Sequence, residues 1–113
     1  MSDPFAPVPV FGLAWVFVDP LAAHGWRLRG RSTRSCHFFA APGDLEELHE
    51  VARLAGLQRR WFQPSGGSRG IPHYDLTPSR RAAVVKLGAV ELSAREAVAF
   101  WRLHYPRPGE RSG

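Results

Sequence analysis

The sequence lacks the features that hold secreted proteins together or anchor proteins in membranes. It contains one cysteine, Cys36, which cannot form an intramolecular disulfide. No apolar run is long enough to cross a bilayer, and no basic stretch leads into an apolar segment with a small-residue cleavage site. We therefore expect a protein of the reducing cytoplasm that makes no use of a membrane.

Lysine is almost absent, since Lys86 is the only lysine among 15 basic residues. The 10 acidic residues leave a net charge of +5. A basic protein attracts polyanions, so this charge favours a phosphate-bearing partner such as a nucleotide or a nucleic acid. The preference for arginine carries no such information, because it can reflect genomic base composition.

The 113 residues are enough for one domain with its own hydrophobic core, and 44% of them are hydrophobic. Residues 1–14 contain several prolines and no periodic pattern, which predicts an extended proline-rich arm. We expect residues 15–105 to form a single α/β domain and residues 106–113 to form a disordered tail.

Short apolar runs predict the strands. The run "LAWVFVDP" is typical of a buried central strand that stops at Asp19 and Pro20. "SCHFFA" alternates, with Cys36, Phe38 and Ala40 on one face and His37 with Phe39 on the other. "QRRWFQ" and "AVEL" are further short strands, whereas residues 21–34, "HYDL" and "PSGGSRGIP" are expected to be loops, the first of them mobile and basic.

Three segments predict helices by their caps and their apolar faces. "GDLEELHEVARLAGL" has Asp44 as its cap and Glu47 as a capping-box partner. Thr77 and Pro78 begin a second helix that is apolar nearly all round and is expected to be well buried, and Ser93, with Glu96 as its capping-box partner, begins a third. Alternating strands and helices predict an α/β fold: a short, mostly parallel sheet of three to four strands with about three helices.

Ligands of parallel α/β sheets bind at the carboxyl ends of the strands, where this pattern places Asp19, His37, His73 and Asp75. His73 and Asp75 lie two residues apart, at ~7 Å, on the same side of an extended segment. That separation excludes a direct bond but suits convergence on one ligand. Each residue also has an ordinary structural interpretation, as a turn former or as a hydrogen-bonded core histidine.

Three functions are compatible with these residues. The first is binding of a phosphate-bearing ligand, with the pocket completed by His37 and Tyr74 and the phosphate held by Arg60 and Arg81. The second is a metal-dependent, nuclease-like hydrolase, in which a divalent cofactor assists the catalytic residues Asp19, His73 and Asp75.

The third function is a protein interaction module or homodimer that uses exposed tryptophans, namely Trp26, Trp61 and Trp101. A nucleophilic role for Cys36 is not expected, because the neighbouring His37 points to the opposite face of its strand.

Four stretches resemble a bacterial and phage family called domain of unknown function 4031. They are "VFVDP", "CHFFA", "DLEELHEVARLAGLQRRWF" and "PHYDLTPSRRAAVVKLGAVELSARE", and together they span most of residues 15–96. The family pattern falls on Asp19, His37, His49, on the triplet from His73 to Asp75, and on Arg81 with the helix end that follows it. The resemblance implies a recurrent fold with a polar site, and it implies no particular activity.

Overall fold

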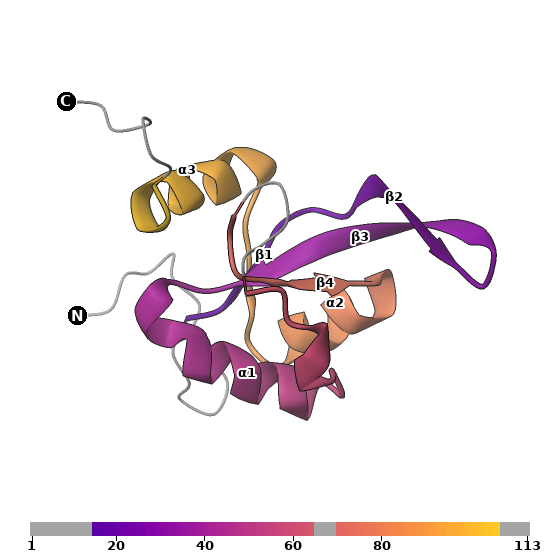
Figure 1. Ribbon diagram of the computed structural model, residues 1–113, viewed down its shortest axis with the longest axis horizontal. Coiled ribbons are helices and arrows are strands. Elements are labelled where there is room, and N and C mark those ends of the chain that lie inside the picture. The colour runs from indigo at the N-terminus through magenta and orange to yellow at the C-terminus, as the bar shows by residue number, and fades with distance from the viewer. Residues whose placement is uncertain (1–14, 65–69, 107–113) are drawn as a thin grey trace.

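Strand β3, which spans Arg31–Phe39, is the centre of the sheet (Figure 1). The computed structural model describes residues 15–64 and 70–106, so the expected arm at residues 1–14 and nearly all of the expected tail lie outside the described residues. Three strands pair antiparallel with β3: β1 (Phe17–Val18), β2 (Ala22–Leu28) and β4 (Tyr74–Leu76). Strand β5 (Val90–Glu91) pairs parallel with β1. The expected α/β class is confirmed, but the sheet has five strands and is mixed, so the mostly parallel arrangement is wrong.

The parallel arrangement fails because residues 21–34, expected to be a mobile loop, form an antiparallel hairpin. Leu28 pairs with Arg31, and Arg29 and Gly30 between them both have positive φ, at 51° and 79°. Two consecutive residues in this conformation are typical of a type I′ turn, the turn that suits the twist of a two-stranded hairpin. The chain therefore reverses within two residues, and no crossover helix is needed.

The HYD triplet is also part of the sheet. Its expected loop is wrong, because Tyr74 and Leu76 are buried and Asp75 is half-buried, so the segment alternates as a strand does. The register pairs His37 with Asp75 and Phe38 with Tyr74. Just before β4, His73 forms a single antiparallel bridge with Gln63, a residue outside the named strands.

The helices begin close to where their caps predict. They are α1 (Leu45–Leu54), α2 (Pro78–Lys86) and α3 (Ala94–His104), and short 3-10 helices occupy η2 (Pro42–Asp44) and η3 (Arg59–Trp61). The η3 segment replaces the strand expected in "QRRWFQ". Thr77 accepts a hydrogen bond from the Arg80 amide, and Ser93 forms the expected capping box with Glu96. Asp44 makes no side-chain capping bond, so that expected capping box is wrong.

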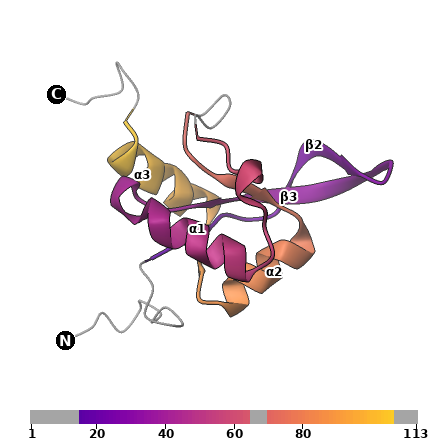
Figure 2. The same ribbon diagram turned by 60° about the horizontal axis from the view of Figure 1, so that its bottom comes forward.

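Two hydrophobic clusters lie on opposite faces of the sheet. Cys36, Phe38 and Ala40 point into the cluster covered by α1 and α2, whereas Phe39 packs against α3 with Ala97 and Trp101 (Figures 1 and 2). The alternation expected for "SCHFFA" is confirmed. No helix in the described part of the chain is long and apolar enough to cross a membrane.

Two expectations about helix faces are wrong. Val84 is the only fully buried residue of α2, because this helix covers the sheet with one side and is otherwise open to solvent. Trp101 on α3 is only 7% exposed and packs against Phe39, so it does not offer a free surface to a partner. Leu103 is 75% exposed.

Candidate metal centre

Three side chains, from β3, from β4 and from the residue before β4, converge on the face of the sheet that α3 covers. His37, His73 and Asp75 each offer a ligand atom, and these three atoms lie within 4.8 Å of one another. The register explains the convergence: Asp75 lies directly opposite His37, and His73 lies two residues before Asp75 on the same face. The two imidazole rings meet edge to face, with centroids 4.9 Å apart.

His73 and Asp75 approach each other more closely than an ideal strand predicts. Nε2 of His73 is 3.3 Å from Oδ1 of Asp75, so the expectation that they are too far apart for direct contact is wrong. The other ring nitrogen, Nδ1, lies 2.7 Å from the Ile71 carbonyl oxygen. A carbonyl only accepts hydrogen bonds, so Nδ1 carries a proton and Nε2 faces the cluster.

Asp19 holds His37 from the end of β1. Its Oδ2 lies 2.7 Å from Nδ1 of His37, and its Oδ1 accepts the His37 backbone amide at 2.6 Å. The next residue, Pro20, has no amide hydrogen for the β3 ladder, and the Asp19 carboxylate supplies a bond to β3 at this break. Because Nδ1 faces a carboxylate, Nε2 is the nitrogen that His37 would present to a metal.

Asp75 is oriented by Gln63, a residue that the sequence did not identify. The Gln63 amide Nε2 donates to Oδ2 of Asp75. Two backbone hydrogen bonds with His73, at 2.8 and 3.2 Å, hold Gln63 in place. The sequence predicts "QRRWFQ" as a strand but does not indicate its partner, so it gives no sign that Gln63 meets the HYD triplet.

The close pair changes the pKa of both partners. Burial alone would lower the pKa of His73, but the hydrogen bonds to Asp75 and to the Ile71 carbonyl outweigh it and raise that pKa above its ordinary value. Burial alone would raise the pKa of Asp75, but the bonds from His73 and Gln63 outweigh it and lower that pKa. These directions favour a charged His73–Asp75 pair when no metal is bound.

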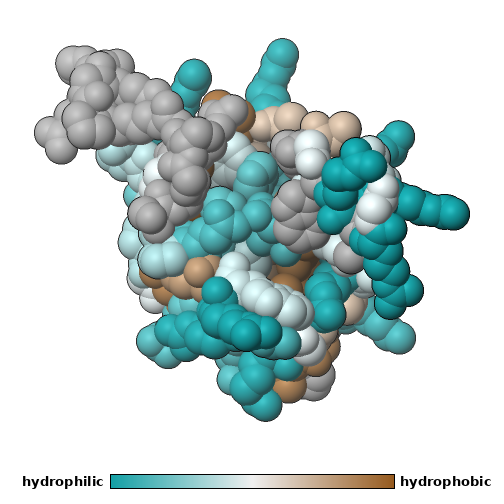
Figure 3. Space-filling view, turned by 45° about the vertical axis from the view of Figure 1, so that its right-hand side comes forward, coloured by the Kyte–Doolittle hydropathy of each residue, from teal (hydrophilic) through white to brown (hydrophobic). Residues whose placement is uncertain are grey.

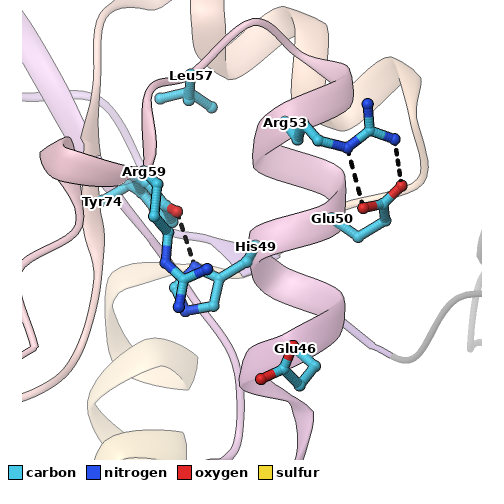
Figure 4. A pocket seen from close by; sticks show the side chains of 7 residues that line it. All are labelled: Glu46, His49, Glu50, Arg53, Leu57, Arg59 and Tyr74. Atoms are coloured by element: carbon cyan, nitrogen blue, oxygen red, sulfur yellow. Dashed lines mark hydrogen bonds and ion pairs between the residues drawn. The ribbon is translucent and has the colours of Figure 1, made fainter.

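Tyr74 does not join this cluster, because it lies between His73 and Asp75 and points to the opposite face of the sheet. Its hydroxyl lies 2.8 Å from Nδ1 of His49. Both residues line an open cleft of about 210 Å³ between α1 and η3 (Figure 4). The full lining is Glu46, His49, Glu50, Arg53, Leu57, Arg59 and Tyr74.

The two arginines expected to hold phosphate lie elsewhere. Arg81 donates from Nε to the Asp19 carbonyl at 3.0 Å and pairs with Glu91 at 2.8 Å. These bonds hold the end of β1 in place and fix the backbone of Asp19. Arg60 is exposed on η3.

Cys36 has the properties of a core residue. Its side chain is fully buried, and burial, helped by the charge of Asp19, raises the pKa of the thiol to about 12. A thiol with this pKa is almost entirely protonated near neutral pH, and the protonated form is a poor nucleophile.

The cluster has the chemistry of a transition-metal site. Two imidazole nitrogens and one carboxylate oxygen form a ligand set that occurs in metalloenzymes with open coordination positions. A cavity of about 10 Å³, bounded by His37, Ile71, His73 and Trp101, lies against the two histidines. This volume is close to the minimum that holds one water molecule.

Comparison with known proteins identifies the chain only at the level of a family. A family model described as "Protein of unknown function (DUF4031)" matches residues 16–104. No curated protein and no solved structure gives a significant match.

Proposed function

Since the chain belongs to the family described as proteins of unknown function (DUF4031), we propose a function from the site itself: His37, His73 and Asp75 bind a divalent transition metal ion that serves the hydrolysis of a phosphate-bearing substrate. The proposal joins two expectations from the sequence, a phosphate-bearing ligand and metal-dependent chemistry, at one place in the fold.

The observation that carries the proposal is that each of the three ligands is oriented by a second group. These groups are the Asp19 carboxylate, the Gln63 amide and the Ile71 carbonyl. Outer partners of this kind set the tautomer and the direction of metal-ligating side chains, and they are typical of metal centres.

The ligand types restrict which metal ions the site can bind. Imidazole nitrogens suit zinc, iron, nickel and copper, whereas calcium and magnesium prefer oxygen ligands. Three protein ligands leave at least one position for water or substrate. Because the set also holds a carboxylate oxygen, which suits manganese, we propose zinc, iron or manganese, with at least one coordination position left to water or substrate.

A metal also explains how a phosphate-bearing substrate is tolerated here. Asp19 and Asp75 are both at the cluster, and two carboxylates would repel a phosphate. Arg81 is already engaged by Asp19 and Glu91. A divalent cation offsets the carboxylate charge and offers a phosphate oxygen a direct partner.

The reaction proposed is addition of water across a phosphoester bond. The water oxygen forms a new bond to phosphorus, the bond from phosphorus to the ester oxygen breaks, and the departing oxygen takes up the proton that the water loses. A bound metal ion supplies Lewis-acid stabilisation and lowers the pKa of its water ligand. The residues of this chain hold the ion and fix the geometry of its ligands.

Metal titration tests the binding step. After removal of metal with a chelator, the protein is titrated with Zn²⁺ or Mn²⁺ by calorimetry and with Co²⁺ by visible absorption. One ion per chain is expected. Asp19→Asn, which replaces the carboxylate oxygen facing Nδ1 of His37 and keeps an oxygen for the His37 amide, is expected to reduce affinity about 10- to 100-fold, and His73→Ala is expected to reduce it further.

His49→Ala is the matched control, because this histidine lies on the opposite face of the sheet and bonds to Tyr74. It should leave metal affinity unchanged. If His73→Ala binds metal as tightly as the unaltered protein, the proposed centre is wrong. Hydrolysis is then tested with bis-p-nitrophenyl phosphate: turnover only with metal supports the hydrolase, and no turnover in the metal-loaded protein removes it.

A further inference from the structure

We propose that the hairpin of residues 22–34, here called the basic ribbon, binds the backbone of a nucleic acid duplex and presents it to the metal centre. Presentation of substrate rests on the proposed function. Duplex binding by the ribbon does not, because it needs no metal.

The basic ribbon stands out from the body of the protein. Strand β2 pairs only with β3 among the described strands, and the ribbon extends past α2 with no helix over it (Figures 1 and 2). The backbone turn at Arg29 and Gly30 forms its tip. The face turned to the viewer in Figure 3 is largely hydrophilic, with several long side chains projecting from it.

The net charge of the whole chain is concentrated in this hairpin. The ribbon carries four arginines and no acidic residue, at positions 27, 29, 31 and 34. All four are exposed. The remaining 11 basic and 10 acidic residues of the chain nearly cancel. A polyanion approaching the molecule is therefore drawn to the ribbon rather than to the surface in general.

Both faces of the ribbon are basic. Arg27 pairs with Ser32, and Arg34 lies two residues further along β3, so Arg27 and Arg34 lie on one face. Arg31 lies on the other face by the same alternation. A two-stranded ribbon fits the major groove of a duplex, where phosphates line both walls. Arginines on both faces match that arrangement, whereas a flat polyanionic surface would meet only one face.

Strand β3 connects the ribbon to the candidate metal centre. Arg31 and His37 lie on the same face of this strand, six residues apart, which is about 20 Å at the usual rise of a strand. This length corresponds to about six nucleotides along one nucleic acid strand. A duplex held by Arg31 therefore has phosphodiesters within reach of His37 and its neighbours.

The first experiment measures binding in the presence of a chelator, so that it is independent of the metal. A labelled duplex of about 20 base pairs is titrated with protein by fluorescence anisotropy. Four phosphate contacts predict that affinity falls about 100-fold between about 50 and 200 mM salt. The triple variant Arg27→Gln, Arg31→Gln, Arg34→Gln should bind much more weakly and lose only a few-fold over the same range.

A second triple variant is the matched control: Lys86→Gln, Arg95→Gln, Arg102→Gln. These residues are exposed on α2 and α3, and the variant loses the same three charges. It should bind the duplex nearly as the unaltered protein does. Because Arg27 also bonds to the Gly30 carbonyl at the ribbon tip, the double variant Arg31→Gln, Arg34→Gln tests the charges with that turn contact intact.

Two results would overturn the ribbon proposal. One is an equal loss of affinity in the two triple variants, which would show that net charge alone matters. The other is strong binding to vesicles of anionic lipid with no binding to the duplex, which would assign the ribbon to a membrane surface.

The second experiment compares cleavage of a duplex with cleavage of bis-p-nitrophenyl phosphate in the metal-loaded protein. The ribbon triple variant should lose duplex cleavage and keep turnover of the small substrate. Equal turnover of both substrates by the variant and the unaltered protein would overturn presentation by the ribbon. If neither substrate is cleaved by the unaltered protein, the proposed hydrolysis fails, while the binding result on the ribbon stands.

Discussion

His73 carries its proton on Nδ1 because that nitrogen faces the Ile71 carbonyl. Its Nε2 is then directed at Asp75, and Gln63 holds the far oxygen of that carboxylate. Each of these hydrogen bonds restricts the rotamer of the side chain that it contacts. The resulting geometry is fixed before any ligand arrives, which is the arrangement that lowers the reorganisation needed for metal binding.

The metal-free protein should show this pair in the pH dependence of its stability. The pKa of His73 is raised from 6.5, so its contribution to the free energy of unfolding is present below pH 6.5 and is lost as the pH rises through the raised value. The pKa of Asp75 is lowered from 3.8, so its contribution is present above pH 3.8 and is lost as the pH falls through the lowered value. His73→Gln should therefore cost more at pH 5 than at pH 8, measured by urea unfolding with a chelator present.

His49 provides a control of opposite sign. Burial, assisted by the charge of Arg59, lowers the pKa of His49, so the folded protein disfavours its charged form. His49→Gln should accordingly cost less at pH 5 than at pH 8. An equal cost of His73→Gln at both pH values would contradict the ion pair with Asp75.

Asp19, His37, His73 and Asp75 were candidates from the sequence, and the structure places them together. The predicted position of two of them in the fold was wrong. His73 and Asp75 were expected in a loop at the end of a parallel strand. Because "HYD" is in fact extended as a strand, its side chains alternate, and Tyr74 points to the face opposite His73 and Asp75, toward His49. Gln63 could not be predicted, because its position depends on a single bridge to His73.

At the scale of elements, the prediction of strand alternation succeeded where the strand packs on a hydrophobic core. Strand β3 from Ser35 onward alternates between two cores, so its period is visible in the sequence. Residues 31–34 of the same strand belong to the basic ribbon and are exposed or half-buried, so no buried face imposes a period of two on them. The two-residue turn that closes the hairpin pairs glycine with arginine, which is not among the common turn signals.

The N-terminal caps of α3 and α1 differ, and this difference can be tested. Ser93 accepts the Glu96 amide at 3.1 Å and Glu96 accepts the Ser93 amide at 2.8 Å, whereas Asp44 makes no capping bond. Ser93→Ala should lower the free energy of unfolding by about 1 kcal/mol, the usual effect of losing a helix cap. Asp44→Ala should change it by less than about 0.5 kcal/mol, as for surface positions without such a bond. Chemical denaturation measures both, and equal losses would contradict the assigned caps.

At the scale of the whole molecule, the candidate centre joins parts of the chain that are far apart in sequence. Asp19 directly follows β1, His37 lies in β3, His73 directly precedes β4 and Asp75 lies in β4. Trp101 of α3 packs edge to face on His37, with centroids 5.6 Å apart. A ligand bound at this junction acts on the sheet and on the helix that covers it, so binding and global stability should be coupled.

Metal binding should therefore raise the melting temperature of the whole domain. An ion at 100 times its dissociation constant adds about 2.7 kcal/mol to the free energy of unfolding if it binds only the folded state. For a domain of this size each kcal/mol corresponds to roughly 4–8 °C, so an increase on the order of 10 °C is expected. Scanning fluorimetry with and without chelator measures it. The increase should vanish in His73→Ala and persist in the ribbon triple variant, whose arginines lie outside the centre; an equal increase in His73→Ala would show that the ion stabilises the fold from another site.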